Sequence, residues 1–487
     1  MEDTKDKVAH LLRRFGLGAT QKEVEEYSRL GLDGALTRLF HYEGVPEDFN
    51  VDPWSFAFLD DKKNPVALDN GRFYSWWANQ MVFTNRPLKE NLALFWHNHF
   101  AVSGAKIEYG PSMLSYLQVL REHANGNFRQ LLGEVSRTVA MIQWLDSDSN
   151  VKGIPNENFG REVMELFTLG VGHYTETDVK EAARAFTGWS TKYSVNFPPK
   201  TSYMQQVLQN VEADRPMFCF CECPELHDDG FKTILGKRKN FDANMVFDLL
   251  VSQPAHAPFL MKKMWEWFVY PNPSQEELDK ICQVYIDYKY EIKPVLMHMA
   301  TSNEFWSAKC HRAVVKSPVA YTMSLARQVQ LGQAFGNKAN LTPAATTPAN
   351  GSLVGMGYQL VNIMQKQGLT LLFPPDVSGW RWGTHWITSA TMMERMRVGD
   401  YFLGRGDVIT SVWQGVTDAY KPDTSEAIVK GLAAWFDMPL DEETREILVK
   451  AVDAAGGPKA FAKQNTAQKV IRNAFKLMSS TPGFQMC

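Results

Sequence analysis

Apolar residues recur every three to four positions through most of this chain, which is the spacing of amphipathic helices. In the first half the pattern predicts helices over 4–14, 20–30, 87–100, 111–124, 127–145, 159–169 and 176–187. In the second half it predicts helices over 242–252, 257–269, 275–288, 291–302, 313–332, 389–404, 424–436, 441–455 and 464–479. The fold class that we predict is therefore mainly α, with one continuous helical unit over 1–487.

Residue types at the ends of two predicted helices agree with these boundaries. Gly170 and Gly188 each follow the last residue of an apolar pattern, where a helix commonly ends. Thr175 and Asp178 have the spacing of a capping box, in which each side chain binds the backbone N–H of the other residue. These signals support a pair of helices joined by a short turn.

One region departs from the helical pattern. Every second residue from 219 to 223 is a cysteine, which gives the two-residue period of a strand. An Asp-Gly turn signal follows, and 231–235 could be the returning strand. We therefore predict an irregular insertion over 190–240 with one short β-hairpin near 217–235, and an irregular loop over 336–352.

Composition and charge argue against several classes of protein. The 487 residues include 51 basic and 54 acidic side chains, for a net charge of −3, so we expect no nucleic-acid partner. The chain has no run of about 18 apolar residues, so we expect no membrane span. The first residues lack the apolar core of a secretion signal and the six cysteines are sparse, which favours a cytoplasmic protein. The alternative is a periplasmic or secreted protein from which a signal was removed.

His97 and His99 lie at the end of the predicted helix over 87–100. At about 100° per residue the two side chains point about 160° apart, so they cannot bind one metal ion if the helix continues through them. His99 shares the apolar face with Leu92 and Phe95. It is either a hydrogen-bonded core residue or part of a site under this helix.

The predicted helix over 159–169 has a polar face with Arg161, Glu162 and Glu165. The two glutamates are three positions apart, which places their Cβ atoms about 5–6 Å from each other. Carboxylates this close can differ in pKa and act as acid and base, or they can bind a cation together. The alternative is a solvated face on which Arg161 pairs with Glu165.

Candidate metal ligands gather in the insertion. Cys219, Cys221 and Cys223 would face one side of a strand about 6.6–7 Å apart, which is wide for a single ion. They lack the Cys-x-x-Cys spacing of structural zinc sites, so packing on a sheet face is the favoured interpretation. His227 and Asp228 follow at a turn, where they are either ligands of one divalent metal ion or turn caps.

Aromatic side chains are concentrated in an irregular loop over 371–388. Trp380, Trp382 and Trp386 accompany Asp376 within this loop. Such a loop suits the wall of a cleft, where indoles stack on sugar rings or other flat groups of a ligand. The alternative is a loop that its own tryptophans hold against the core.

Common catalytic motifs are missing. The chain has no P-loop, Rossmann fingerprint, His-Glu-x-x-His or Gly-x-Ser-x-Gly sequence. This argues against nucleotide-driven, nicotinamide-linked and common serine-hydrolase chemistry.

Seven motifs nevertheless form a recognisable set, in order, over nearly the whole chain. They occupy 11–18, 96–100, 156–170, 174–189, 227–228, 316–318 and 374–380. This set resembles the bacterial domain-of-unknown-function 1800 family, which implies one family unit. The triple cysteine is not part of the family's pattern, and this favours its interpretation as packing.

The resemblance brings no established activity, but it implies that polar residues of these motifs belong to one site. They are His99, Arg161, Glu162, Glu165, His227 and Asp376, with Trp380 near the rim and Arg184 as a further ligand-binding candidate. It also implies a partner protein from a neighbouring gene of a sulfatase-like family.

We therefore hypothesise a hydrolase that acts on a carbohydrate-type or other polar polymer, or on a small molecule. Glu162 and Glu165 would supply the acid and base, with His99 as a proton carrier or metal ligand. Arg161 would bind an anionic group of the ligand. The cofactor implied is at most one divalent metal ion, held at the His-Asp motif.

Two alternatives belong to other classes of protein. One is a non-catalytic binding or scaffold protein, in which the polar motifs form a buried network. The other is a metal-dependent oxidoreductase. The solvent exposure of these polar groups distinguishes a scaffold protein from an enzyme. An enzyme needs them around one solvent-reachable pocket, whereas the groups of a structural network are buried and paired with each other.

Overall fold

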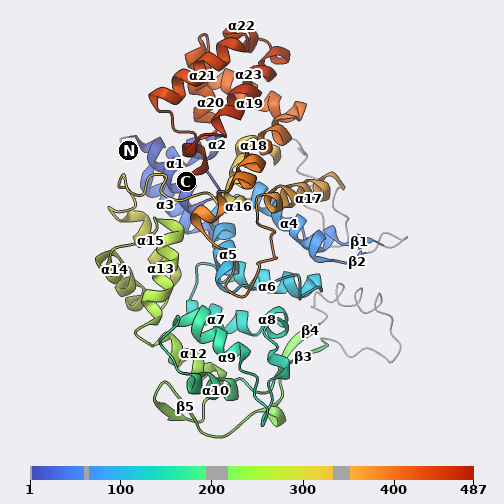
Figure 1. The fold of residues 1–487 in the computed structure, drawn as a ribbon, viewed down its shortest axis with the longest axis vertical. Helices are drawn as coiled ribbons and strands as arrows, with labels where there is room; N and C mark the ends of the chain where they lie inside the picture. Colours follow the sequence, from blue (N-terminus) through green and yellow to red (C-terminus); the bar gives the residue numbers. More distant parts are fainter. Residues whose placement is uncertain (1–2, 60–64, 194–217, 333–350) are drawn as a thin grey trace.

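The computed structural model describes residues 3–59, 65–193, 218–332 and 351–487, and helices dominate it (Figure 1). The prediction of a mainly α protein is confirmed. The helices of the first half are α1 (Thr4–Phe15), α2 (Gln21–Ser28), α3 (Gly31–Phe40), α4 (Asn70–Phe83), α5 (Pro87–His99), α6 (Gly110–Glu122), α7 (Phe128–Ser136), α8 (Val139–Trp144), α9 (Asn158–Glu162) and α10 (Glu176–Ala185).

The second half adds a further series of helices. They are α12 (Ala243–Val251), α13 (His256–Phe268), α14 (Gln275–Asp287), α15 (Ile292–Thr301), α16 (Pro318–Gln328), α17 (Gly351–Lys366), α18 (Ser389–Leu403), α19 (Gly406–Tyr420), α20 (Ser425–Trp435), α21 (Glu442–Ala454), α22 (Gly457–Phe461), α23 (Gln464–Met478) and α24 (Pro482–Gln485). No helix among the described residues is long and apolar enough to cross a membrane.

Most predicted helices occur close to their expected ranges, and the exceptions have local causes. The predicted segment 127–145 divides into α7 and α8, because Thr138 caps a new helix by accepting a hydrogen bond from the backbone N–H of Met141. The predicted segment 313–332 begins only at Pro318, because the residues before it pair with the chain's last residues. Helix α4 has no clear apolar stripe, since most of its residues are buried and several of the buried ones are polar, and the sequence pattern missed it.

The described strands form three antiparallel pairs, and their partners differ from the predicted hairpin. The pairs are β1 (Phe58–Leu59) with β2 (Pro65–Ala67), β3 (Trp189–Tyr193) with β4 (Phe218–Glu222), and β5 (Lys232–Ile234) with β6 (Lys237–Lys239). The strand near 217–223 is therefore confirmed, but its pairing with 231–235 is wrong. Leu235 and Gly236 both have positive φ and close a tight turn, which pairs β5 with the strand that follows it.

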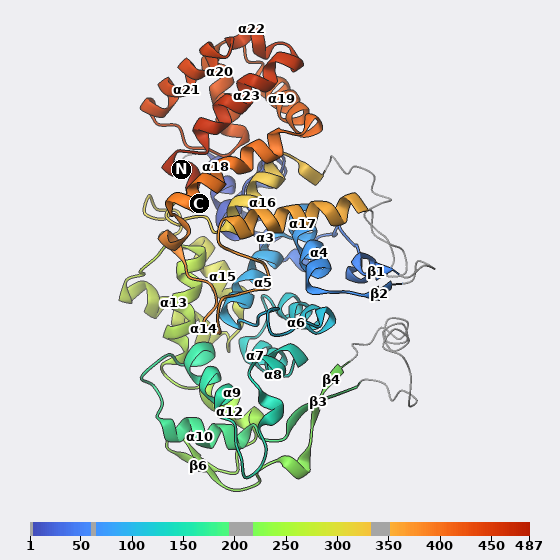
Figure 2. The same ribbon diagram turned by 45° about the vertical axis from the view of Figure 1, so that its right-hand side comes forward.

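The elements are arranged along one long axis (Figures 1 and 2). Helices α19 to α23 form one end, and α9, α10, α12 and β5 form the other, with α5 and α16 between them. Buried apolar residues form one continuous cluster from Val8 to Phe484. The loop over 371–388 is irregular as predicted, apart from the short helix η8 (Gly383–Trp386). The loop predicted over 336–352 falls almost wholly on 333–350, outside the described residues.

Both ends of the described chain meet in the middle of the molecule, where α1 lies beside the last residues (Figure 1). Val314 and Cys487 exchange two backbone hydrogen bonds, and the N–H of Lys316 donates to the carbonyl of Gln485. The C-terminal segment is therefore held between α1 and the start of α16, and this junction contains the candidate site.

Candidate functional site

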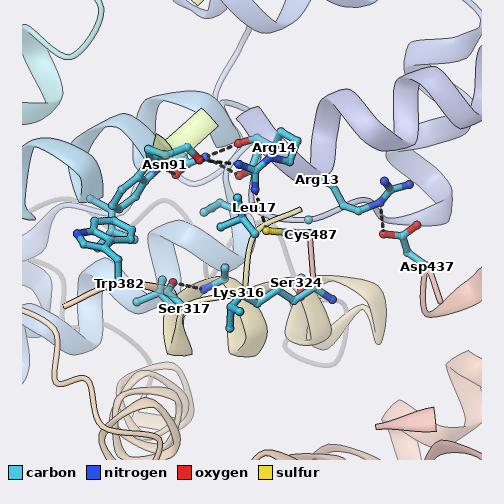
Figure 3. A pocket seen from close by; sticks show the side chains of 18 of the residues that line it. Arg13, Arg14, Leu17, Asn91, Lys316, Ser317, Ser324, Trp382, Asp437 and Cys487 are labelled. Atoms are coloured by element: carbon cyan, nitrogen blue, oxygen red, sulfur yellow. Dashed lines mark hydrogen bonds and ion pairs between the residues drawn. The ribbon is translucent and has the colours of Figure 1, made fainter. Parts of the chain in front are cut away.

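A small cavity lies where α1, α5, the start of α16 and the C-terminal segment meet (Figure 3). Its volume is about 60 Å³, which is room for a few water molecules at roughly 10–15 Å³ each. A cavity of this size suits one small polar or anionic group rather than a whole sugar ring. Its charged and aromatic lining residues are Arg13, Arg14, Lys316, Asp437, Trp267 and Trp382.

Two features of the sequence build the cavity wall locally. Gly18 has a φ of +100°, and a Cβ at this position would lie 2.3 Å from the Cβ of Ser324, so only glycine lets this turn approach α16 so closely. Asn91 binds the same turn, because its Nδ2 donates to the carbonyls of Arg14 and Gly16. The arginines at the end of α1 are thus held in place by α5 and α16.

Two buried cations of the cavity pair with no side-chain carboxylate among the described residues. Arg14 donates to the carbonyls of Trp267 and Phe268 and to the Sγ of Cys487, at 2.8, 3.2 and 3.0 Å. Lys316 donates from Nζ to the carbonyl of Phe484 at 2.9 Å. Burial lowers the pKa of Lys316 to about 8, and the neighbouring Arg312 acts in the same direction. These groups are satisfied as donors, but their charges are not neutralised.

The third cation of the cavity, Arg13, shares the carboxylate of Asp437 with Arg312. Arg13 Nε lies 2.7 Å from Asp437, and Arg312 lies 3.1 Å from the same carboxylate. Asp437 has the only side-chain carboxylate among the described residues that line the cavity. The side chain of Arg13 is 6% exposed, and its Nη1 is buried without a hydrogen-bond partner among the described residues. The cavity therefore has an excess of buried positive charge and an unsatisfied guanidinium N–H.

Trp382 lies at one side of the cavity (Figure 3), and Trp267 also lines the cavity. The rings of Trp267 and Trp382 are 3.9 Å apart, and 41% of Trp382 is exposed. The other two predicted stacking residues are buried: Trp380 packs against the ring of His97, and Trp386 is 7% exposed. Trp380 is therefore in the core and not at a rim, because the N–H of Trp380 donates to Asn98 and holds the loop inward.

The predicted acidic pair lies elsewhere, at the junction of α9 and the π-helix η4 (Val163–Thr168). The alternative of an Arg161–Glu165 ion pair is wrong. Arg161 lies 2.6 Å from Glu176 and 3.4 Å from Glu157, and Glu165 accepts a hydrogen bond from Tyr174. The wider turn of the π-helix changes the direction of side chains after residue 162, which the regular helical wheel did not anticipate.

Glu162 is half-buried beside Glu165 on this segment. Burial raises the pKa of Glu162, and the negative charge of Glu165 raises it further. A nearby negative charge has this effect because it disfavours the ionised form of the carboxyl group.

His99 is sealed in the core and binds the π-helix rather than a carboxylate. Its Nε2 lies 3.1 Å from the carbonyl of Phe167, and Lys263 Nζ lies 3.5 Å from its Nδ1. Burial holds the pKa of His99 well below its usual range, with Lys263 acting in the same direction. His97 instead contacts the hydroxyl of Tyr116, so the prediction that the two histidines point to different partners is confirmed.

Two more side chains hold the same π-helix. His256 Nδ1 lies 3.0 Å from the carbonyl of Thr168, and Lys263 Nζ donates to the carbonyl of Leu166 at 3.2 Å. Together with His99 they occupy three successive carbonyls that the wide turn leaves without regular helical partners. This is the arrangement expected of a structural network.

The last predicted residues form separate groups. Arg184 binds both carboxylate oxygens of Asp228, at 2.8 and 3.1 Å, and His227 Nδ1 lies 2.9 Å from the carbonyl of Thr187. Arg184 holds the pKa of Asp228 down to about 2. Asp376 is exposed, and its carboxylate accepts hydrogen bonds from the backbone N–H and the hydroxyl of Ser378.

The groups around Arg161 and Arg184 do not line the basic cavity, and they are also separate from each other. Arg161 contacts the first residue of α10 and Arg184 lies near its last, so the 10-residue length of α10, about 14 Å, separates them. Among the described residues, no group of three or more histidine, cysteine, aspartate or glutamate side chains could hold a metal ion.

A family model described as "Protein of unknown function (DUF1800)" matches residues 10–486. The chain belongs to this family. Comparisons with curated proteins and with solved structures found no match.

The basic cavity is built from segments that carry motifs of the DUF1800 protein. Motifs 11–18 and 316–318 supply Arg13, Arg14 and Lys316, which sequence reasoning did not select as site residues. Their signal is nevertheless visible, because two adjacent arginines end a helix whose other last residues are apolar. Asp437 lies outside every motif, so the sequence around it gave no reason to place a site there.

Proposed function

We propose that this protein binds an anionic group of a carbohydrate-type polar ligand in the basic cavity. The observation that carries the proposal is the excess of buried side-chain positive charge, together with Nη1 of Arg13, which has no hydrogen-bond partner in the described part of the chain. Buried cations without a counter-charge are costly, and a carboxylate, sulfate or phosphate group would offset this cost with charge-assisted hydrogen bonds. Among the alternatives drawn from the sequence, this supports the binding protein.

The exposed indole supports a flat ring attached to that anionic group. Trp382 packs edge-on against Trp267 beside the cavity, so its free surface could stack on a sugar while the anionic substituent enters the cavity. The small volume of the cavity supports this division, because it accommodates the substituent alone. Sulfated and uronic-acid polysaccharides are the ligand class that combines both features.

The experiment is a binding titration with dextran sulfate, with neutral dextran as the ligand control. We expect wild-type protein to bind dextran sulfate with an affinity that falls as salt rises, and to ignore neutral dextran. Arg13→Gln and Lys316→Gln should each weaken binding, and Trp382→Ala should weaken binding of the polymer more than that of inorganic sulfate.

The matched control is Arg445→Gln, which removes an arginine from the exposed ion pairs of α21. It changes the net charge by the same amount as Arg13→Gln but lies outside the cavity. Equal loss of binding in both variants would contradict the proposal and indicate general attraction of a polyanion. Circular dichroism and thermal unfolding establish that each variant is folded.

A second candidate function is hydrolysis of such a polymer, favoured by the raised pKa of Glu162. Glu162 would donate a proton to the leaving group, with Glu165 as the base. Glu162→Gln and Glu165→Gln should then abolish release of reducing ends while each leaves the melting temperature within a few degrees. A loss of stability without any activity in the wild-type protein would contradict this candidate and assign the pair a structural role.

Partner and location follow from the ligand class. A sulfatase-like partner, which the family resemblance implies, would act on the same kind of anionic polymer. An extracellular polymer would require the exported location rather than the cytoplasmic one.

A further inference from the structure

Cys219 and Cys221 share one face of β4, opposite the face that packs on the core, and Cys223 follows directly after the strand. In the register of β3 and β4, Trp189 is opposite Glu222 and Ser190 is opposite Cys221. The ring of Phe220 packs against Trp189 at 5.4 Å, so the Phe220 face points inward. Residues of the other face, Cys219 and Cys221, therefore point away from the core, and both are half-buried.

Cys223 extends this arrangement beyond the strand. Its φ of −108° and ψ of 96° continue the extended backbone, so its side chain keeps the alternation and joins Cys221 on the same face. The two thiols are close enough to share a hydrogen bond. All three cysteines are free thiols.

With ideal strand spacing, Cys221 and Cys223 are too far apart for a disulfide but suit a metal bridge. Residues two apart on one strand face are about 6.6–7 Å apart, with nearly parallel Cα–Cβ bonds. A disulfide needs Cβ atoms about 3.5–4.5 Å apart, so it would require the backbone to move. A metal ion bound in a line between two sulfur atoms, with bonds of about 2.3 Å, holds these atoms about 4.6 Å apart. The two side chains can reach this separation by small rotations.

We propose that Cys221 and Cys223 bind one soft monovalent metal ion of the Cu(I) class through two thiolates. Soft thiolate ligands select such ions, and a two-coordinate ion needs no further protein ligand. Zinc would need four ligands, and the described residues offer no group of three or more at this place.

The charge and proton balance of binding are simple. Each thiol loses its proton, two sulfur–metal bonds form, and neither the sulfur atoms nor the ion changes oxidation state. The resulting complex carries one negative charge. Lys192 lies directly opposite Cys219 on the same face and would stabilise this charge.

The test is an anaerobic titration of the full chain with Cu(I) in competition with a chromogenic chelator. We expect one tightly bound equivalent, with ultraviolet sulfur-to-copper absorption, and loss of this equivalent in Cys221→Ser and in Cys223→Ser. Cys282→Ser is the matched control, because Cys282 is a free thiol buried in α14, and it should keep the equivalent. Cys219→Ser should also keep it, since the third thiol is not a required ligand.

A second measurement avoids substitutions altogether. Bound Cu(I) should protect Cys221 and Cys223 of the wild-type protein from alkylation by a maleimide, as read by mass spectrometry of peptides. The proposal is overturned if both cysteines stay reactive, if either serine variant binds Cu(I) as the wild type does, or if Zn²⁺ competes equally for the site.

Discussion

At the scale of single residues, Asp437 is the carboxylate on which the basic cavity depends. It pairs with both Arg13 and Arg312, which are largely buried. Its φ of +50° lies in the left-handed region, which aspartate and asparagine tolerate better than most residues. Asp437→Asn therefore removes the charge while it keeps the shape and the backbone conformation.

We predict that Asp437→Asn lowers the free energy of unfolding by about 3 kcal/mol or more, because it leaves two buried guanidinium groups without a counter-charge. Urea denaturation of the purified protein measures this change. Glu157→Gln is the control, since it removes a half-exposed partner of Arg161 and should cost less than about 1 kcal/mol.

Anion binding gives this prediction a second readout. If the cavity of Asp437→Asn has collapsed, added sulfate should stabilise this variant less than it stabilises the wild-type protein. In an intact cavity the gain in melting temperature with sulfate should be larger for Asp437→Asn than for wild type, because the variant has more uncompensated positive charge. An equal gain in both proteins would contradict a role of Asp437 in the charge balance.

At the scale of elements, the turn between α10 and β3 brings the motif at 174–189 against the motif at 227–228. Gly188 has a φ of +85°, and a Cβ there would lie 2.7 Å from the carbonyl oxygen of Cys223 and 3.1 Å from the N–H of His227. The N–H of Cys223 also donates to the carbonyl of Gly188 at 2.7 Å. Glycine at this position therefore lets the turn approach the end of β4.

We predict that Gly188→Ala lowers the melting temperature clearly more than Gly172→Ala. Gly172 has a similar φ of +90° but no atom within 4 Å of the added Cβ. Both variants bear the strain of a left-handed alanine, about 1–2 kcal/mol, and only Gly188→Ala adds a collision with backbone atoms. Thermal unfolding followed by circular dichroism compares them, and equal losses would show that the close approach is unimportant.

At the scale of the whole molecule, four buried histidines couple stability to pH. Burial lowers the pKa of His10 and His97 to about 3 and that of His256 to about 4, and it holds the pKa of His99 well below its usual range. The folded protein keeps these rings neutral. The unfolded chain binds protons at them below about pH 6.5, so acid favours unfolding.

We predict that the free energy of unfolding falls as the pH drops from 6.5 toward 4, by up to about 1.4 kcal/mol per pH unit for each histidine. Urea denaturation at pH 7.5, 6.5 and 5.5 measures the slope. His97→Asn should reduce the slope, because it removes one of the four buried rings. A stability that stays constant down to pH 5.5 would contradict the buried neutral state.

Short-range patterns in the sequence determined the helical class and many helix boundaries. The capping box of Thr175 and Asp178 is present as predicted, because it depends on residues three positions apart. The irregular aromatic loop and the strand at β4 were also visible in local composition and alternation. Periodicity did not identify α4, since its buried residues include polar ones and so do not form an apolar stripe.

Only the tertiary structure decided which residues meet. Arg13 and Asp437 are 424 positions apart, and the carbonyl partner of Arg14 lies 254 positions away, so no local pattern could indicate the basic cavity. The π-helix and the partner of β4 likewise depend on contacts with distant segments. Local propensity acts over a few residues, whereas charge balance and burial depend on the packing of the complete chain.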